Sequence, residues 1–194
     1  MKYLIPILMI IVIQQDKITD YRDQQEYSLK TIGDKTWIKE NLRFLEVNPG
    51  KFILSHEKYG VYYKNGKLDN VCPDGYHIPS LSEWKSLIEQ LPGKRNSRQG
   101  KLVPMTSLND NELLLGGMGR QDTVLLSQVM GYYWTSTDTL KTFYKEPDNG
   151  LQKHLIGIHI WSSGEQDSIN VEPTYMLAET YASMIKMNCK CIKD

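Results

Sequence analysis

The segment CPDGYHIPSLSEW, from Cys72 to Trp84, constrains the fold of this chain more than any other segment. Its first four residues predict a turn, because a proline and a glycine flank a polar residue. Pro79 disfavours helical backbone at the preceding residue, so the chain should reach Ser80 in an extended conformation. Ser80 and Glu83 have the spacing of a capping box, in which each side chain hydrogen-bonds to the backbone of the other residue.

A helix from Leu81 to Leu91 should follow this cap. Its apolar residues recur at helical spacing and form one stripe, which consists of Trp84, Leu87, Ile88 and Leu91. Pro92 and Gly93 then end the helix. The segment therefore predicts where a helix begins and which of its faces is buried. On this reading Glu83 serves the cap and His77 is a hydrogen-bonded turn residue. The four tryptophans, Trp37, Trp84, Trp134 and Trp161, are most simply core residues, although an exposed one could stack on a sugar.

Other parts of the chain predict strands and loops. Strands are expected at Tyr27–Ile32 and Thr36–Ile38 (joined by a Gly33-Asp34 turn), Val61–Tyr63, Met130–Thr137, Leu155–Trp161 and Met184–Ile192. Loops are expected at Leu45–Gly60, Pro92–Asn111 and Thr142–Lys153. The periodicity of Glu172–Tyr181 suits a helix. The whole pattern is that of one mixed α+β domain with few helices and many loops.

Length and charge narrow the class of protein. The 194 residues suit a single domain with a real core. Basic and acidic residues balance at 23 each, which argues against a nucleic-acid or anionic-membrane partner.

Residues 1–15 have the pattern of a signal peptide. Lys2 provides a positive start, and Leu4 to Ile13 is apolar apart from Pro6. This run is too short to cross a bilayer, which requires about 20 residues, so no transmembrane span is expected in the mature chain. The other interpretation is a buried N-terminal strand. We expect residues 16–194 to form the exported domain, in the periplasm, on the outer-membrane surface or outside the cell.

Export bears on the three cysteines, because disulfides persist in oxidising compartments. Cys189 and Cys191 are two residues apart, so both could face the same neighbour on an extended strand. Either of them could then pair with Cys72, and the odd number leaves one thiol over.

Six blocks occur in a specific order along the chain: IGDKTWIKENLR (Ile32 to Arg43), GVYY (Gly60 to Tyr63), CPDGYHIPSLSEW, GGMGR (Gly116 to Arg120), GYYWTST (Gly131 to Thr137) and CKCIKD (Cys189 to Asp194). In this order and over about residues 20 to 194, the chain resembles the Fibrobacter succinogenes major paralogous domain family. Its members are exported proteins, mostly from Bacteroidetes and their relatives.

The resemblance implies a C-type-lectin-like fold of the formylglycine-generating-enzyme-like subgroup. Such a fold has small twisted antiparallel sheets, one or two helices and long loops, and its first and last strands lie together. The family pattern also implies a disulfide between Cys72 and Cys191, which should contribute on the order of 4 kcal/mol. Cys189 falls where the family usually has valine.

The favoured function is the binding of a glycan or a protein ligand through loops on this scaffold, without enzymatic activity. The loops that resemble the family least are the candidates, and the residues singled out in and near them are Tyr144, Glu146, Asp148, Asn149 and Trp161. The EPDNG run, Glu146 to Gly150, is similar to the calcium and sugar motif of true C-type lectins but has different spacing. Calcium binding is therefore a secondary hypothesis, and no other cofactor is expected.

Two other functions stay open. One is a structural or assembly component of the cell surface without a small ligand. The other is an enzyme related to formylglycine-generating oxidases, in which Cys189 and Cys191 would form a copper-binding pair. Their spacing and position differ from the oxidase pattern, and the chain has no Gly-rich phosphate loop, Ser-His-Asp order or HExxH motif.

Overall fold

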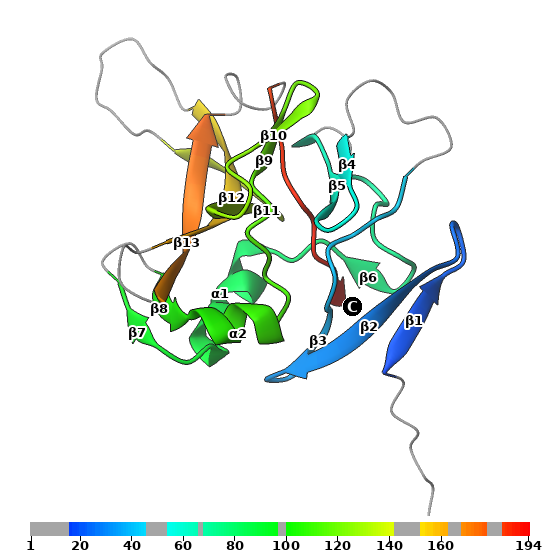
Figure 1. Cartoon of the computed structure of the whole chain (residues 1–194), viewed down its shortest axis with the longest axis horizontal. Helices are drawn as coiled ribbons and strands as arrows, with labels where there is room; N and C mark the ends of the chain where they lie inside the picture. Colours follow the sequence, from blue (N-terminus) through cyan, green and yellow to red (C-terminus); the bar gives the residue numbers. More distant parts are fainter. Residues whose placement is uncertain are drawn as a thin grey trace, which may run out of the picture.

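The computed structural model describes residues 16–45, 54–65, 68–96, 100–141, 152–162, 168–177 and 184–194. These residues form a mostly β structure with two short helices and several antiparallel sheets (Figure 1). The predicted antiparallel sheets with one or two helices are therefore confirmed. Residues 1–15, the expected signal peptide, lie outside the described ranges.

The first sheet joins the two ends of the described chain. Its order is β1-β2-β3-β15-β6, formed by β1 (Lys17–Asp20), β2 (Gln25–Ile32), β3 (Lys35–Ile38), β15 (Ile192–Lys193) and β6 (Tyr76–His77). The predicted hairpin is confirmed, and Gly33 at its turn has a φ of +63°. Because β15 lies between β3 and β6, a strand near the N-terminus pairs directly with the last strand.

A second five-stranded sheet has the order β11-β12-β13-β8-β7. Its strands are β11 (Met130–Lys141), β12 (Gln152–Ser162), β13 (Ser168–Leu177), β8 (Lys101–Pro104) and β7 (Lys94–Arg95). A smaller sheet contains β10 (Thr123–Leu125), β9 (Met118–Arg120) and β14 (Ile185–Lys186), and β4 (Leu54–His56) pairs with β5 (Gly60–Tyr62).

Helix α1 (Leu81–Gln90) begins as the sequence predicts. The Ser80 hydroxyl accepts a bond from the Glu83 backbone N–H at 3.3 Å, and the Glu83 carboxylate accepts one from the Ser80 N–H at 2.8 Å. Trp84 is fully buried, with its ring centroid 5.3 Å from that of Trp37 and 5.5 Å from that of Tyr133. The capping box thus places the apolar stripe of α1 against both large sheets.

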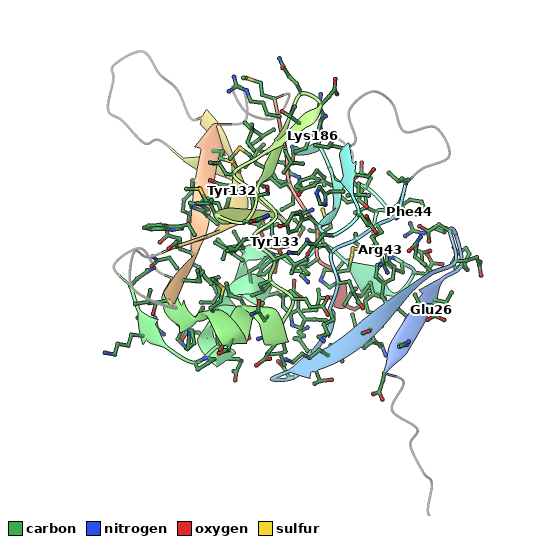
Figure 2. The ribbon with its side chains drawn as sticks, in the orientation of Figure 1. Glu26, Arg43, Phe44, Tyr132, Tyr133 and Lys186 are labelled. Atoms are coloured by element: carbon green, nitrogen blue, oxygen red, sulfur yellow. A yellow bond between two sulfur atoms is a disulfide. The ribbon has the colours of Figure 1, made fainter. Side chains whose placement is uncertain are left out.

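Strand β11 supplies side chains to two cores. Tyr133 packs with Trp84 of α1 and with Ile158 and Ile160 of β12, whereas Tyr132 and Trp134, the residues on either side of it, belong to the other core. Figure 2 labels the neighbouring residues Tyr132 and Tyr133. The alternation follows from the two-residue period of a strand. Strand β11 therefore forms the wall between the two cores.

Three predictions of local structure were wrong in part. Residues 172–177 belong to β13, which pairs with β12 from His154↔Leu177 to Ser162↔Ile169, and not to a helix; residues 178–181 lie outside the described ranges. The region Pro92–Asn111 contains β7, β8 and helix α2 (Met105–Asp110), and β4 lies within Leu45–Gly60. In β13 the pairing with β12 prevails over the helical periodicity of the local sequence.

The C-terminal region also departs from the single predicted strand. It forms the two short strands β14 and β15. In the segment between these strands, Met187 forms an isolated bridge with Tyr63 and Asn188 forms one with Tyr133. Residues between the strands still pair, but each pairs with a different neighbour. A Cβ added at Gly116 would lie 2.7 Å from Asn188 Oδ1, so this glycine is needed for the close approach of the terminal segment.

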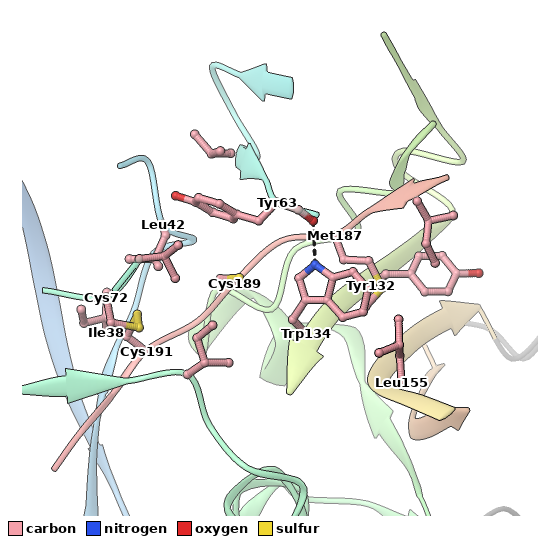
Figure 3. Close-up of a cluster of buried hydrophobic side chains, with 14 of the residues drawn as sticks. Ile38, Leu42, Tyr63, Cys72, Tyr132, Trp134, Leu155, Met187, Cys189 and Cys191 are labelled. Carbon is pink, nitrogen blue, oxygen red and sulfur yellow. Dashed lines mark hydrogen bonds between the residues drawn. A yellow bond between two sulfur atoms is a disulfide. The ribbon is translucent and has the colours of Figure 1, made fainter. Parts of the chain in front are cut away.

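The disulfide joins Cys72 to Cys191, with their Cα atoms 5.9 Å apart. This pairing, implied by the family resemblance, is confirmed, and Cys189 remains a buried free thiol. Figure 3 shows Cys189 in the same core as Trp134, whose indole N–H donates to the Tyr63 carbonyl at 2.7 Å. Burial raises the pKa of the Cys189 thiol well above its usual value.

Lys190, between the two terminal cysteines, is a buried amine. Its Nζ donates to the carbonyl oxygens of Lys39 and, at 2.9 Å, Glu112. Burial lowers the pKa of Lys190 to about 7, although the charges of Glu112 and Glu40 oppose the shift. The amine therefore ties the terminal segment to two other loops.

Replacing both disulfide cysteines, Cys72→Ala with Cys191→Ala, should lower the free energy of unfolding by about 4 to 5 kcal/mol. The reason is that a crosslink between residues 119 apart restricts the unfolded chain. Urea unfolding without reductant measures this difference. Cys189→Ala is the control and should cost only about 1 kcal/mol. A non-reducing peptide map that links Cys72 to Cys189 would contradict the assignment.

Lys190 should make stability depend on pH. Above about pH 7 the folded amine loses its proton while the unfolded amine keeps its own, so the unfolded state binds more protons and stability rises with pH. Relative to Lys190→Met, the wild-type free energy of unfolding should rise by about 2 kcal/mol between pH 7 and 9. Urea unfolding of both proteins at these two pH values checks it. If the free energy of unfolding changed by the same amount in both proteins, Lys190 would not titrate between pH 7 and 9.

Candidate ligand-binding hollow

A hollow of about 800 Å³ lies beside the disulfide. Its polar lining residues include Tyr21, Arg22, Asn65, Asp69, Asn70, Asp74, Tyr76, His77, Ser136 and Thr137. Its apolar lining residues include Leu68, Val71, Ile78, Trp134, Leu155 and Ile156. Ligand-binding pockets commonly have volumes of about 300 to 1,000 Å³. The hollow is thus large enough for an organic ligand.

One wall is a bulge in β11. Trp134 pairs with Gly157 and Asp138 with Leu155, so three residues of β11 (135–137) face a single residue of β12. The extra residues turn toward α1: the Ser136 N–H donates to the Pro79 carbonyl at 3.0 Å, and the Thr137 hydroxyl accepts from the Leu81 N–H at 3.0 Å. Bulges often lie beside functional sites, where they redirect side chains.

The opposite wall is the CPDG turn and the residues before it. The Tyr76 N–H donates to the Pro73 carbonyl at 3.0 Å, and Gly75 has a φ of +76°. Asn70 also has a positive φ, +55°, which is uncommon for a residue other than glycine. Such backbone persists only where the surroundings hold it in place.

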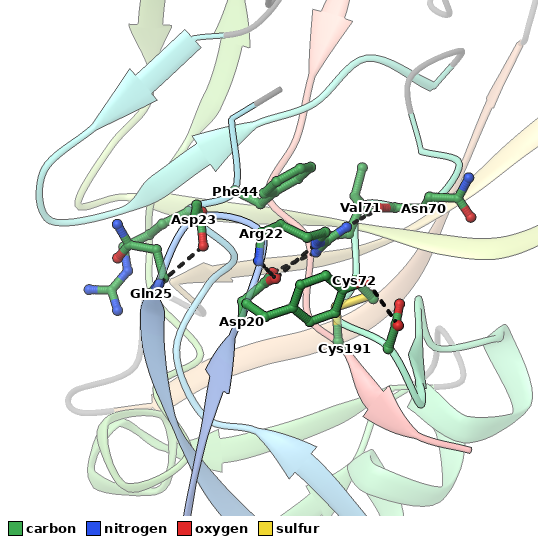
Figure 4. Close-up of polar contacts among 12 residues, drawn as sticks. Asp20, Arg22, Asp23, Gln25, Phe44, Asn70, Val71, Cys72 and Cys191 are labelled. Carbon is green, nitrogen blue, oxygen red and sulfur yellow. Dashed lines mark hydrogen bonds and ion pairs between the residues drawn. A yellow bond between two sulfur atoms is a disulfide. The ribbon is translucent and has the colours of Figure 1, made fainter. Parts of the chain in front are cut away.

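Arg22 holds this wall. Its Nε and Nη2 donate to the two carboxylate oxygens of Asp20 at 2.8 and 2.6 Å, and it also donates to the carbonyls of Asn70 and Val71. The guanidinium lies 3.8 Å from the ring centroid of Phe44 (Figure 4). Burial alone would raise the pKa of Asp20, but the hydrogen bonds and charge of Arg22 outweigh burial and lower it. The pair therefore fixes the β1–β2 turn to the disulfide loop.

Tyr21 stands at the rim of the hollow. Its side chain is 64% exposed, and its hydroxyl donates to Asp74 Oδ2 at 3.0 Å. Asp74 lies on the opposite segment, 53 residues away in sequence. An exposed aromatic ring is thus held in one orientation by a carboxylate of the facing turn.

His77 lies between two carboxylates at the end of the hollow. Its Nδ1 is 2.6 Å from Asp194 Oδ1, and its Nε2 is 3.2 Å from both carboxylate oxygens of Glu83. The nearby Ser80 hydroxyl contacts Glu83 at 2.8 Å, and no contact joins it to the imidazole. A serine nucleophile requires a base in direct contact, so the described cluster has the form of a structural tie.

The residues predicted from sequence lie elsewhere. Tyr144, Glu146, Asp148 and Asn149 lie outside the described residues. Trp161 is half-buried on β12, and its indole N–H donates to Glu172 at 3.1 Å. Its ring stacks with that of His159, which in turn stacks with the ring of Tyr132. Trp37, Trp84 and Trp134 are buried, as predicted for core residues.

The hollow itself was not predicted. Its lining residues come from the N-terminal turn, from residues 65 and 68–78, from β11 and from β12, and the sequence does not show that these segments meet. The one usable signal was the WTST run, because three consecutive small polar residues after a buried tryptophan suit a bulge.

Neither proposed metal gains support from the described residues. They contain no group of three or more His, Cys, Asp or Glu side chains arranged for a metal ion. A copper-binding cysteine pair does not fit, because Cys191 is bonded to Cys72 and the Cys189 thiol is buried with a raised pKa. The EPDNG run lies outside the described residues.

Comparison with family models, with curated proteins and with solved structures gave no match. Within the part of the chain that the structure describes, neither helix has the length and apolar character needed to cross a membrane.

The Glu83→Gln variant tests the cap and its contact with His77. Burial would raise the pKa of Glu83, but bonds from Ser80 and His77 lower it overall, so its stabilisation is present above about pH 4.5 and is lost as pH falls. The variant should be less stable than wild type by about 1 to 2 kcal/mol at pH 7. The gap should narrow at pH 3 in urea unfolding.

Glu89→Gln, on the same helix but outside the cap, serves as the matched control. It should change stability by less than about 0.5 kcal/mol at either pH. If Glu83→Gln lowered the free energy of unfolding as much at pH 3 as at pH 7, the charge of the Glu83 carboxylate would contribute nothing to stability.

Proposed function

We propose that this chain is an exported, non-enzymatic recognition domain that binds a glycan or protein ligand in the hollow beside its disulfide. It would act in the periplasm, on the outer-membrane surface or outside the cell. The observation that carries the proposal is the hollow of about 800 Å³, in which hydroxyl, amide, carboxylate and tyrosine groups converge beside apolar side chains.

The chemistry of the lining favours a hydroxyl-rich ligand. Carboxylate and amide groups such as those of Asp69, Asp74 and Asn65 can exchange hydrogen bonds with sugar hydroxyls. The exposed ring of Tyr21 offers an apolar face for the C–H side of a sugar and keeps its hydroxyl engaged with Asp74. A glycan is therefore the first candidate, and a polar segment of a protein is the second.

The rigidity of the walls supports binding as the role. The disulfide, the Asp20–Arg22 pair and the β11 bulge each fix one side of the hollow. A site that is already ordered loses little conformational entropy when a ligand binds. The same features serve recognition without requiring any reacting group.

Export and family membership are parts of the same proposal. The disulfide suits an oxidising compartment. The pairing of β15 with β3, the two short helices and the Cys72–Cys191 bond agree with what the resemblance to the Fibrobacter succinogenes major paralogous domain family implies. A C-type-lectin-like fold is our proposal on these grounds.

A structural or assembly role is the second candidate, because one apolar patch is exposed. Leu125, Leu126 and Val129, at the end of β10 and just after it, are 39%, 47% and 50% exposed, and β10 is an edge strand of its sheet. Exposed apolar groups on a sheet edge are typical of contact surfaces between proteins. The thiols give no comparable support to an enzyme related to formylglycine-generating oxidases.

A bulky side chain placed in the hollow should weaken ligand binding. Ser136 is exposed on the bulge, so Ser136→Trp should place an indole in the hollow and weaken binding at least about tenfold, a change of about 1.4 kcal/mol. A glycan array followed by calorimetry with the best ligand measures the effect. Tyr21→Ala should weaken the same interaction through loss of the rim ring.

Ser86→Trp is the matched control, because Ser86 is exposed on α1 and does not line the hollow. It should leave binding unchanged. No binding to any glycan or peptide, together with a crosslinked partner lost on Leu126→Lys, would favour the assembly role instead.

A further inference from the structure

Arg22 is the sole lysine or arginine among the described residues that line the hollow. Whether the hollow can attract an acidic ligand therefore depends on whether this guanidinium is available. Arginine is otherwise well suited to bind carboxylate, sulfate or phosphate groups through paired N–H donors.

The Arg22 guanidinium is already committed to the protein. Nε and Nη2 contact the Asp20 carboxylate, Nη1 donates to the Asn70 carbonyl, and Nη2 also donates to the Val71 carbonyl at 3.0 Å. One face of the group lies on the Phe44 ring. Asp20 is 0% exposed, so its negative charge faces Arg22 from inside the wall and cancels the positive charge at the hollow.

The remaining charges of the hollow are acidic or are paired. Asp69 and Asp74 line it with exposed carboxylates. His77 contacts the carboxylates of Glu83 and Asp194 on its two ring nitrogens. A ligand with an acidic group would therefore meet two carboxylates and a neutralised guanidinium that already donates four of its five N–H groups to the protein. Like charges in one site are repelled.

We infer that the hollow binds an uncharged, hydroxyl-rich ligand and rejects acidic glycans; this inference rests on the proposed function. Asp20 sets this selectivity as a positioning residue, because it holds Arg22 in the wall and neutralises it. Sugar hydroxyls can accept from Ser136 and Thr137 and, unlike ionised acidic groups, can also donate to Asp69 and Asp74. The preference for a neutral ligand thus follows from the neutralisation of Arg22 by Asp20.

The test compares matched oligosaccharides with one backbone, in a neutral form and in forms that carry uronate or sulfate. Calorimetry at low salt should show the acidic forms binding at least about tenfold more weakly to the wild-type protein. The difference should shrink as salt is raised, because salt screens charges at a partly exposed site. Loss of neutral-ligand binding in Ser136→Trp locates the interaction in the hollow.

Two variants test the role of Asp20 and the charge of the hollow. Asp20→Asn should free the charge of Arg22 and reduce the gap between neutral and acidic forms to less than about threefold. Glu26→Gln changes the net charge by the same amount at an exposed position of β2, and it should leave the difference between neutral and acidic forms unchanged. Ser136→Lys adds a cation to the hollow without touching the pair, so it should also narrow the gap even if Asp20→Asn fails to fold.

The outcomes separate the inference from the proposed function. Equal or tighter binding of acidic forms to the wild-type protein, still lost in Ser136→Trp, would overturn the inference and leave the recognition function standing. An unchanged gap in both Asp20→Asn and Ser136→Lys would overturn the role of charge. Binding of a peptide in the hollow but of neither class of oligosaccharide would overturn the inference and leave the recognition function standing. Binding of neither class and of no peptide, or binding that Ser136→Trp does not affect, would overturn the proposed function and the inference with it.

Discussion

The segment from Met187 to Ile192 forms backbone hydrogen bonds with strands and loops that lie between Trp37 and Trp134 in the sequence. Met187 exchanges two bonds with Tyr63, at 2.8 and 3.0 Å, and the Asn188 carbonyl accepts from the Trp134 N–H at 3.0 Å. Cys189 and Cys191 accept further bonds through their carbonyls, from the loop after β3 and from β3 itself. Because each bond spans a large part of the chain, the two cores and the first sheet all depend on this one segment. The disulfide to Cys72 makes that arrangement covalent.

The hollow is a consequence of the same arrangement. The disulfide anchors residues 72–78, the Asp20–Arg22 pair anchors the turn between β1 and β2 against them, and the β11 bulge closes the other side. Each wall is therefore fixed by a contact to a distant segment and not by its own local structure. Such a site is ordered before a ligand arrives, and this order is the physical basis on which we propose a role in recognition.

Several parts of the fold followed from local sequence. The capping box at Ser80 and Glu83, the stripe on α1 and the Gly33 turn involve residues a few positions apart, so their chemistry is readable in order. The periodicity of residues 172–177 misled, because a strand in the middle of a sheet takes its conformation from its neighbours. Trp161 was predicted both as a core residue and as a ligand contact, and its half-buried place on β12 agrees with neither extreme.

The sequence by itself determined the beginning of α1, the first hairpin, the burial of three tryptophans and, through a family resemblance, the Cys72–Cys191 bond. Tertiary structure decided the register of β13, the bulge in β11, the hollow and the contacts of Arg22 with the Asn70 and Val71 carbonyls. The physical reason is distance along the chain. Arg22 meets the Asn70 carbonyl across 48 positions, and Tyr21 meets Asp74 across 53, and no local pattern encodes a contact between two such segments.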